Sequence, residues 1–478
     1  MQSSAISQQR AVLQSLPVRQ FKTNSAEVES GDVFVCRQGI SLDGHDFVVR
    51  AVNQGACAII ANRPLQASVP VIVTDSYYQS LALIKAYYQH PHKVVSHIGV
   101  TGTNGKTTVS HCLNQILNLE SRSAYIGTLG AQLVEEQVPL TNTTPDGVTL
   151  LNIFQQMRMQ DTEFNVMELS SHALAQDRAG FVSLEVGVIT NIGEDHLDFH
   201  RTKDSYIHAK LQLVDRIQSK GTLVVNLDDP HALASIERAS QGIKVVTFSK
   251  AGQKADVVAS NIKSFGRGMR FTLTAAGESV EVRSPMPFLY NVENALAIAS
   301  TLYALSWSLE KITQGIERIE MPEGRAQFVE LPNDCKGLVD YAHNSDGLKA
   351  LLEAVQDYVE RRLIVVVGVT GDRLQQASEM GAICAKYADL IVFTSDNPMG
   401  VIQGEIFQAL RSQVGSTPHF EISDRREAIK LAKKISEGGD LVVVCGKGSE
   451  TFQYLSDGKD QKQSYIGDLA ALQIAEAL

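Results

Sequence analysis

The segment Gly102-Thr103-Asn104-Gly105-Lys106-Thr107-Thr108 has the residue types of a phosphate-binding loop. Glycines let the backbone N–H groups of such a loop curl around phosphate oxygens, and the helix that follows adds its positive N-terminal end. Lys106 can neutralise the β- and γ-phosphates of ATP, and the Thr107 hydroxyl can ligate Mg²⁺. The strict Walker pattern is not met, because the position five residues before Gly105 is Val100. Gly-Lys-Thr is a common tripeptide, so the alternative interpretation is a plain glycine turn between a strand and a helix.

Three further residues could contribute to a metal site near this loop. Glu168 ends a predicted strand, where a carboxylate lies beside a phosphate loop and could hold Mg²⁺. His196 follows another apolar strand and could ligate a second metal. Lys210 lies on a predicted helix, where a lysine is normally solvated. By position alone, a strand-end acid in solvent is an equal interpretation of Glu168, and a surface histidine is the better interpretation of His196.

Strand-like and helix-like runs alternate around these residues, which indicates a parallel sheet wrapped by helices. In the middle of the chain the sequence predicts a helix at Val109–Leu119 and strands at Val94–Thr101, Asn165–Glu168, Glu185–Thr190, Thr222–Asn226 and Lys244–Phe248. After residues 322–324 a second alternation predicts a smaller doubly wound domain, with helices at Leu348–Arg361 and Arg426–Lys434 and strands at Gly337–Tyr341, Leu363–Gly368, Leu390–Thr394 and Leu441–Cys445. The first 90 residues or so predict a third unit, with strands near Val33–Cys36 and Ala58–Ala61 and a helix near Gln79–Tyr88.

The composition narrows the class of protein. The chain has 478 residues, 44% of them hydrophobic and 20% charged, which suits two to four globular domains. A net charge of -10 without long lysine or arginine runs disfavours a nucleic-acid partner. The first 16 residues lack the apolar core of a signal peptide, and no apolar run approaches the roughly 18 residues of a membrane helix. Six scattered cysteines fit buried thiols in a reducing compartment, so we expect a soluble cytoplasmic protein.

Taken together, the motifs along the chain resemble those of the Mur ligases, most closely the MurE branch, which adds the third amino acid of the peptidoglycan stem peptide. The GTNGKTT form of the phosphate loop is a variant found in this family. The shared motifs are Asn24-Ser25, 31–34, 102–108, 142–145, 168–172, 195–200, 291–294, 323–325, 340–343, 396–398 and 446–450. Those at 142–145, 168–172 and 195–200 separate this branch from its MurC, MurD and MurF relatives.

The resemblance implies an α/β fold of three domains. The small N-terminal α/β domain, residues 1–90, would bind the UDP-sugar end of the acceptor. The central parallel-sheet P-loop ATPase-like domain, residues 91–321, would bind ATP, and the C-terminal Rossmann-like domain, residues 322–478, would bind the amino acid. The implied protein is a cytoplasmic, monomeric enzyme of cell-wall biogenesis that supports cell shape and cell division.

The resemblance also implies a role for individual residues. The expected ATP site is Gly102, Thr103, Asn104, Gly105, Lys106, Thr107, Thr108, Asn294, Arg325 and Asp340. Thr107 and Glu168 would hold a first Mg²⁺, and Glu168, His196 and a CO₂-derived carbamate on Lys210 would hold a second. The expected acceptor site is Ser25, Asn142, Thr143, Thr144, Ser170, Gln176 and Arg178, and the expected amino-acid site is Arg373, Asp396, Asn397, Met399, Gly446 and Glu450. The expected catalytic residues are Lys106, Lys210, His196 and His343.

Met399 marks a departure from the family pattern. Members that add meso-diaminopimelate carry Asp-Asn-Pro-Arg, whose arginine grips the distal carboxylate, whereas this chain has Asp396-Asn397-Pro398-Met399. A thioether cannot pair with a carboxylate, and the loop at 371–378 also lacks the usual Lys-Arg pair. We therefore expect an amino acid other than diaminopimelate, with L-lysine favoured. Near the N-terminus, the family's Asp-Ser-Arg is Asn24-Ser25-Ala26, which weakens the expectation for nucleotide-sugar binding.

The implied reaction transfers the γ-phosphate of ATP to the terminal carboxylate of UDP-N-acetylmuramoyl-L-Ala-D-Glu, and the amino acid attacks the resulting acyl phosphate. Two alternatives remain at this point. One is a Mur-ligase paralogue, or a ligase like folylpolyglutamate synthase, that acts on another carboxylate acceptor. The other is a nucleotide-binding scaffold without catalysis, which the presence of Lys106, Glu168, His196 and Lys210 disfavours.

Overall fold

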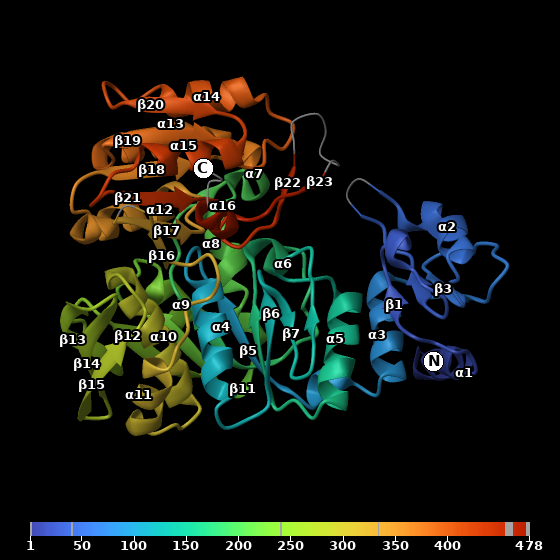
Figure 1. The fold of residues 1–478 in the computed structure, drawn as a ribbon. Coiled ribbons are helices and arrows are strands. Elements are labelled where there is room, and N and C mark those ends of the chain that lie inside the picture. The colour runs from blue at the N-terminus through green and yellow to red at the C-terminus, as the bar shows by residue number, and fades with distance from the viewer. Residues whose placement is uncertain (1, 40–41, 240, 333, 455–461, 475–478) are drawn as a thin grey trace. The chain divides into compact units, whose positions relative to one another are not determined.

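The computed structural model describes residues 2–39, 42–239, 241–332, 334–454 and 462–474 (Figure 1). The chain forms two compact units, and each is assembled from several segments. Unit 1 comprises Met1–Gly99, Leu117–Glu185 and Arg216–Gln218, and unit 2 comprises Val100–Ile116, Val186–Asp215 and Ser219–Leu478. Among the described residues, no helix combines the length and the apolar character needed to span a membrane.

The N-terminal part of unit 1 is a small sheet with helices. Its four strands pair in parallel in the order β1-β2-β3-β4. The strands are β1 (Phe21–Lys22), β2 (Val33–Val35), β3 (Ala58–Ala61) and β4 (Val71–Val73), and the helices are α1 (Gln2–Gln14), α2 (Val48–Asn53) and α3 (Tyr77–Tyr87). Short 3₁₀ turns occur at Ser25–Glu27, Gly44–Phe47 and Pro91–Lys93. The predicted strands at Val33–Cys36 and Ala58–Ala61 correspond to β2 and β3.

The rest of unit 1 belongs to the middle of the chain. Its strands follow the order β5-β9-β6-β7-β8, and β5 continues into unit 2. The elements are β5 (Ser96–Thr101), β6 (Ser123–Gly127), β7 (Gly130–Gln132), β8 (Gln137–Val138), α5 (Gly147–Met159), β9 (Phe164–Glu168) and α6 (Ser171–Ala175). The Asn152 side chain of α5 bonds both backbone groups of Phe21 in β1, which ties the two parts of this unit together.

Unit 2 contains the phosphate loop, the helix that follows it and a second run of strands. The strand order here is β15-β14-β13-β12-β11-β10. The elements are α4 (Lys106–Leu117), β10 (Leu184–Ile189), α7 (Leu197–His200), α8 (Lys203–Leu211), β11 (Ile217–Asn226), α9 (Ala232–Arg238), β12 (Lys244–Ser249), β13 (Val257–Phe265), β14 (Gly268–Ala275), β15 (Glu278–Ser284), α10 (Leu289–Ala304) and α11 (Leu309–Glu317), with a 3₁₀ turn at Val214–Arg216. Strands β13, β14 and β15 are antiparallel, an addition to the expected parallel pattern.

The C-terminal part of unit 2 is a six-stranded sheet in the order β16-β17-β21-β18-β19-β20, in which only the β16–β17 pair is antiparallel. Its strands are β16 (Gln327–Leu331), β17 (Cys335–Asp340), β18 (Leu363–Val367), β19 (Leu390–Thr394), β20 (His419–Ile422) and β21 (Leu441–Cys445). Its helices are α12 (Ser345–Ala354), α13 (Leu374–Tyr387), α14 (Gln403–Arg411), α15 (Arg425–Ile435) and α16 (Asp468–Gln473), with 3₁₀ turns at Val355–Tyr358 and Gly371–Arg373 and a hairpin of β22 (Phe452–Tyr454) and β23 (Lys462–Ser464).

Both faces of this sheet are covered, which explains the continuous Val/Ile runs in its sequence. Alternate residues of β18 point to opposite sides: Val365 joins the core beneath α12, α13 and α14, whereas Ile364 joins the core beneath α15 and α16. Figure 1 shows these helices around the orange and red strands. The strands predicted at Leu363–Gly368, Leu390–Thr394 and Leu441–Cys445 are therefore present, because a strand buried on both faces is apolar along its whole length.

Candidate functional site

The phosphate loop joins the end of β5 directly to the start of α4. Gly105 has a φ of +85°, and a Cβ there would collide with the Asn294 side chain, so this position requires glycine. Helix α4 begins at Lys106, three residues before the predicted start at Val109. The first backbone N–H groups of α4 therefore belong to the loop itself, which is the geometry that holds a phosphate at a helix N-terminus.

Hydrogen bonds from the segment after β10 hold this loop. The backbone N–H of Asn104 donates to the Asn191 side chain at 2.9 Å, and the Asn191 amide and the Thr190 hydroxyl donate back to the Asn104 carbonyl at 3.1 and 2.7 Å. The Thr103 hydroxyl accepts from the backbone N–H of Gly193 at 2.8 Å. The loop is thus fixed before any nucleotide binds.

Two lysines converge on the carbonyl groups of the loop. Lys106 Nζ donates to the carbonyls of Gly102 and Thr103 at 2.9 and 3.0 Å. Lys210 Nζ donates to the same Gly102 carbonyl at 2.6 Å, and its amine lies 4.5 Å from the centre of the Tyr206 ring. Lys210 is only 1% exposed, and burial together with the Lys106 charge lowers its pKa well below the usual lysine value. The fold therefore favours an uncharged amine at this position.

Asp195, which was not among the predicted site residues, connects the segment before α7 to the C-terminal part of unit 2. Its carboxylate is 2% exposed and pairs with Arg373 through Nε at 2.9 Å. Asn344 donates to the other carboxylate oxygen at 3.2 Å, and His343 Nε2 lies 3.9 Å from it. Burial alone would raise the pKa of Asp195, but the Arg373 charge dominates and holds it well below its usual range. Arg373, predicted to face the amino acid, is here the partner of Asp195.

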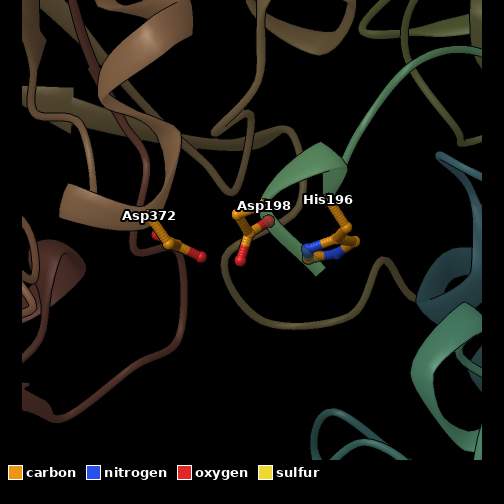
Figure 2. Close-up of side chains that lie close together, drawn as sticks. All are labelled: His196, Asp198 and Asp372. Atoms are coloured by element: carbon orange, nitrogen blue, oxygen red, sulfur yellow. The ribbon is translucent and has the colours of Figure 1, made fainter. Parts of the chain in front are cut away.

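His196 lies among acidic groups beside this pair. Figure 2 shows His196, Asp198 and Asp372, whose nearest ligand-type atoms all lie within 4.8 Å of one another. Burial and the nearby Asp372 charge raise the pKa of Asp198, and the Arg373 guanidinium approaches His196 Nε2 to 3.4 Å. One imidazole and two carboxylates form a donor set that suits a divalent cation. The sequence analysis expected His196 to share a metal with Glu168 and Lys210, whereas its acidic neighbours here are Asp198 and Asp372.

The expected ATP contacts from the later part of the chain reach the loop. The Arg325 guanidinium donates to the Thr107 hydroxyl at 3.2 Å and stacks 4.0 Å above the Tyr341 ring. Asn294 is the side chain that closes over Gly105, and it donates to Asn291 at 2.8 Å. Thr108 is buried in the first turn of α4.

Asp340 and His343 support this arrangement from the end of β17. Asp340 accepts from the backbone N–H groups of Ala326 and Ala342 at 2.7 and 2.8 Å, so it fixes the backbone next to Arg325. His343 Nδ1 donates to the Tyr341 carbonyl at 2.7 Å. Burial, followed by the Arg373 charge, lowers the pKa of His343 to about 4, so its ring is neutral near pH 7.

The predicted amino-acid residues gather around one buried lysine that the prediction left out. Lys447 is fully buried, and its Nζ donates to Asp396 and Asn397 at 3.2 Å each and to Glu450 at 2.8 Å. Glu450 also accepts from the Tyr341 hydroxyl at 3.0 Å. Burial would raise the pKa of Asp396, but Lys447 and Arg425 lower it, so its carboxylate is charged. Lys447 lies inside the Gly446–Glu450 motif, whose two end residues were predicted to face the amino acid. The motif could therefore have indicated Lys447 as well.

Met399 lies at the tip of a tight turn next to this cluster. The Val401 N–H donates to the Pro398 carbonyl at 2.9 Å across the turn, and Met399 and Gly400 both have positive φ angles, +52° and +87°. The Met399 side chain is 39% exposed. The Gly371 N–H donates to the Asn397 carbonyl at 2.9 Å, so this turn and the segment before Arg373 lie side by side.

The predicted acceptor residues of unit 1 surround the end of β9. The Thr144 hydroxyl donates to the Glu168 carbonyl at 2.7 Å and accepts from the Ser170 N–H at 3.1 Å, and Ser170 caps α6. Arg178 donates to Gln176 at 2.9 Å and to the Thr144 carbonyl at 3.0 Å. The structure thus brings these four residues together in one network.

The remaining predicted residues of unit 1 lie around this network or apart from it. The buried Glu168 carboxylate accepts from the Tyr125 hydroxyl at 2.5 Å and from the Thr128 N–H at 3.0 Å. Thr143 shares a 3.2 Å hydrogen bond with the Thr128 hydroxyl. Ser25 is buried in the 3₁₀ turn after β1, and Asn142 is exposed. The metal role of Glu168 stays a prediction.

Comparison with known proteins covers almost the whole chain. Three family models match in succession: the Mur ligase family catalytic domain at residues 17–100, the Mur ligase middle domain at 100–302, and the Mur ligase glutamate ligase domain at 324–448. The UDP-N-acetylmuramoyl-L-alanyl-D-glutamate--2,6-diaminopimelate ligase of Geobacillus thermodenitrificans is 35% identical over 445 residues, 91% of this chain and 90% of that protein. The enzyme of the same name from Bacillus licheniformis is 36% identical over 447 residues, covering 92% and 91%.

Solved structures agree with this assignment. A ligase structure with the same name is 28% identical, with a TM-score of 0.62, and covers 95% of this chain and 94% of that one. MurF from Acinetobacter baumannii is 22% identical with a TM-score of 0.72, covers 94% and 95%, and shows the fold alone. The N-terminal, middle and C-terminal domains expected from the sequence motifs are confirmed. The chain belongs to the Mur ligase family and is an ATP-dependent ligase of the MurE type.

Proposed function

We propose that this ligase joins the third amino acid of the peptidoglycan stem peptide to UDP-N-acetylmuramoyl-L-alanyl-D-glutamate. The observation that carries the proposal is the assembled phosphate site, in which Arg325 reaches Thr107 and Lys210 reaches Gly102. A carboxylate must be activated before an amine can attack it, and Lys106 and Arg325 would supply the positive charge for activation by ATP. The names of the relatives supply the acceptor.

The residues of the loop fit ATP with Mg²⁺. Gly102–Thr108 would hold the phosphates through backbone N–H groups, and Thr107 with Glu168 would hold a first Mg²⁺. Bound Mg²⁺ would neutralise charge on the transferred phosphoryl group. Lys106 and Arg325 would place further positive charge on the same oxygens, and Asn294 would line the loop at Gly105. The domain boundaries that we propose are 1–90, 91–321 and 322–478.

Lys210 would take part as a CO₂-derived carbamate. CO₂ adds only to an uncharged amine, and burial of Lys210 favours that form by lowering its pKa. The carbamate would turn a cationic side chain into an anionic oxygen ligand for a second Mg²⁺, together with Glu168 and His196. His196 also lies beside Asp198 and Asp372, so these carboxylates are available to the same cation.

The chemistry proceeds through an acyl phosphate in this proposal. The terminal carboxylate of the acceptor attacks the γ-phosphorus of ATP and ADP leaves. The amine of the incoming amino acid then adds to the acyl carbon, and phosphate leaves as the amide forms. His343 is neutral and can accept the proton that the amine loses. Asp396, Asn397, Gly446 and Glu450 would orient the amino acid, and Thr143, Thr144, Ser170, Gln176 and Arg178 the acceptor.

L-Lysine is our first candidate for the amino acid. Met399 stands where a diaminopimelate enzyme needs a cation, and a thioether cannot pair with the distal carboxylate. The second candidate is meso-diaminopimelate, because the relatives from Geobacillus and Bacillus carry that substrate in their names. Arg373 is paired with the buried Asp195 carboxylate, so its guanidinium does not replace the missing arginine.

We further propose a cytoplasmic monomer that acts in cell-wall biogenesis and through it in cell shape and division, with small-molecule substrates and neither nucleic-acid nor membrane partners. The net charge of -10 disfavours nucleic acid.

An assay of phosphate release tests the substrates directly. The purified chain is given ATP, Mg²⁺ and UDP-N-acetylmuramoyl-L-Ala-D-Glu with L-lysine, meso-diaminopimelate or another amino acid, and the product is identified by mass. We expect amide formation with L-lysine. Turnover with meso-diaminopimelate only would overturn the lysine assignment. No product with any amino acid would overturn the acceptor and favour a paralogue or a folylpolyglutamate-synthase-like ligase. No ATP hydrolysis with any carboxylate would favour the non-catalytic scaffold.

A further inference from the structure

Arg37, two residues after β2, has a half-buried side chain for which the described residues offer no hydrogen-bond acceptor. The contact that the structure gives it is with an aromatic face: its Cζ lies 5.1 Å from the centre of the Tyr77 ring. A guanidinium has five N–H donors, and a cation–π contact with a ring face requires none of them as hydrogen bonds. The side chain is therefore held in place while its donors stay available.

A second arginine, Arg178, reaches the same region. Arg37 lies over the Tyr77 ring, whose hydroxyl donates to Asp146, and Arg178 donates to the Thr144 carbonyl two residues before Asp146. The charge of Arg37 lowers the pKa of Arg178, after the larger effect of burial, so the two guanidinium groups repel each other. Arg178 uses two donors on Gln176 and on the Thr144 carbonyl. Among the described residues, no carboxylate lies within ion-pair distance of either arginine.

Asp146 is an acidic residue whose charge acts on Arg178, and its oxygens have other partners. It caps α5 by accepting from the N–H groups of Val148 and Thr149 and from the Thr149 hydroxyl. The Tyr77 hydroxyl donates to it at 3.4 Å. Arg37, Arg178 and Asp146 together carry a net positive charge, and a bound anion would neutralise it.

We infer that Arg37 and Arg178 form an anion clamp, a two-arginine site for one oxyanion group of the acceptor. The inference rests on the proposed function, in which Arg178 already faces the acceptor, and it adds Arg37 and the Tyr77 platform to that site. Phosphate and carboxylate both match the planar fork of a guanidinium. The group held is either the diphosphate of the nucleotide or a carboxylate of the peptide end.

Steady-state kinetics of Arg37→Met test the clamp. We expect the KM for UDP-N-acetylmuramoyl-L-Ala-D-Glu to rise about tenfold or more, as for loss of a charge-assisted hydrogen bond, with kcat and the KM for ATP within about threefold of wild type. Arg37→Lys keeps the charge without the fork and should give a smaller rise. Arg50→Met, at an exposed position of helix α2, is the matched control and should leave all constants unchanged. An unchanged acceptor KM in a folded Arg37→Met protein would overturn the inference.

A direct binding measurement tests the anion clamp independently of the proposed ligase activity. With the phosphate loop filled by ADP, inorganic pyrophosphate and UDP-N-acetylglucosamine are titrated calorimetrically into wild type and Arg37→Met. Weaker binding of both by the variant assigns the clamp to the diphosphate, whereas a loss confined to the full acceptor in the kinetics assigns it to a carboxylate. If wild type makes no amide, the proposed function fails, and equal pyrophosphate binding by the two proteins would then also reject the anion clamp.

Discussion

At the scale of single residues, Lys210 has a chemistry that depends on where the fold places it. An exposed lysine is a permanent cation near pH 7, whereas burial beside the phosphate loop and beside Lys106 favours the free amine. The same burial leaves the Gly102 carbonyl as its hydrogen-bond acceptor. This environment is consistent with a lysine that is modified by CO₂ before it acts.

Replacing Lys210 by alanine should lower the rate of ligation roughly 100-fold or more, because a charged group next to the transferred phosphate is lost. Small carboxylic acids added to the assay should restore part of the activity by supplying the missing carboxylate oxygens. Lys203→Ala is the matched control, since Lys203 is an exposed lysine on the same helix α8. Full activity of the Lys210 variant would contradict the carbamate role.

Met399 decides the choice of amino acid in our proposal. Its backbone is already in the left-handed region and its side chain is partly exposed, so Met399→Arg adds a guanidinium to the turn without a new backbone requirement. We expect kcat/KM for meso-diaminopimelate to rise about tenfold and that for L-lysine to fall, measured by product mass in competition. A variant whose preference equals that of wild type would show that residue 399 does not contact the distal group.

At the scale of elements, the buried Asp195–Arg373 pair joins the segment before α7 to the 3₁₀ turn before α13. Removing one partner leaves an unpaired buried charge, which destabilises by about 3–5 kcal/mol, whereas removing both does not. The double variant Asp195→Asn/Arg373→Met should therefore lose less free energy of unfolding than the sum of the losses in the two single variants.

Denaturant unfolding of the four proteins measures this coupling, which we expect to be about 1–3 kcal/mol. Arg238→Met provides a comparison, because Arg238 pairs with Asp215 at an exposed site where ion pairs contribute little. Strict additivity of the Asp195 and Arg373 changes would mean that the pair does not link the two segments.

His97 in β5 makes unit 1 sensitive to acid. Its Nε2 donates to the His92 carbonyl at 2.9 Å and its Nδ1 accepts from Asn165 at 3.0 Å, so the buried ring is neutral, and burial lowers its pKa to about 4. The unfolded chain, with a histidine pKa near 6.5, binds more protons between about pH 6.5 and pH 4. The free energy of unfolding should therefore fall as the pH falls through this window, by up to about 1.4 kcal/mol per pH unit from this group.

Replacement of His97 by glutamine should flatten the pH dependence of unfolding, since glutamine does not titrate. Urea unfolding at several pH values between 4 and 7 measures the slope for both proteins. Other titrating groups remain in both, so the comparison isolates the histidine. Equal slopes would contradict the assignment of acid sensitivity to His97.

At the scale of the whole molecule, the chain should be a monomer with a mass of 52.1 kDa. Each of the three substrate-binding regions is built from residues of a single chain, so the proposed reaction requires no second copy. Light scattering after size exclusion, with and without ATP and the acceptor, measures the mass. A stable dimer at low micromolar concentration would overturn this expectation.

The three-domain architecture could be predicted from local patterns in the sequence. The strands of the C-terminal sheet are short apolar runs, and the phosphate loop is a contiguous segment between a strand and a helix. Helix boundaries were less accurate: α12 starts at Ser345, not Leu348, because Asn344 caps it by accepting from the Gly347 N–H. The antiparallel strands β13–β15 were not predicted, although the alternating burial of β14 is the pattern of a half-buried strand.

By itself, the sequence determined the family, the phosphate loop and the types of the residues around it, because motifs and strand periods are local properties. The tertiary structure alone decided which of those residues meet. Arg373 pairs with Asp195 across 178 positions, and Lys447 gathers three side chains that the motifs only named. Burial and ion-pair partners depend on packing between residues that are far apart in the sequence, and so does the charge state of Lys210. The spacing of residues along the chain does not determine these properties.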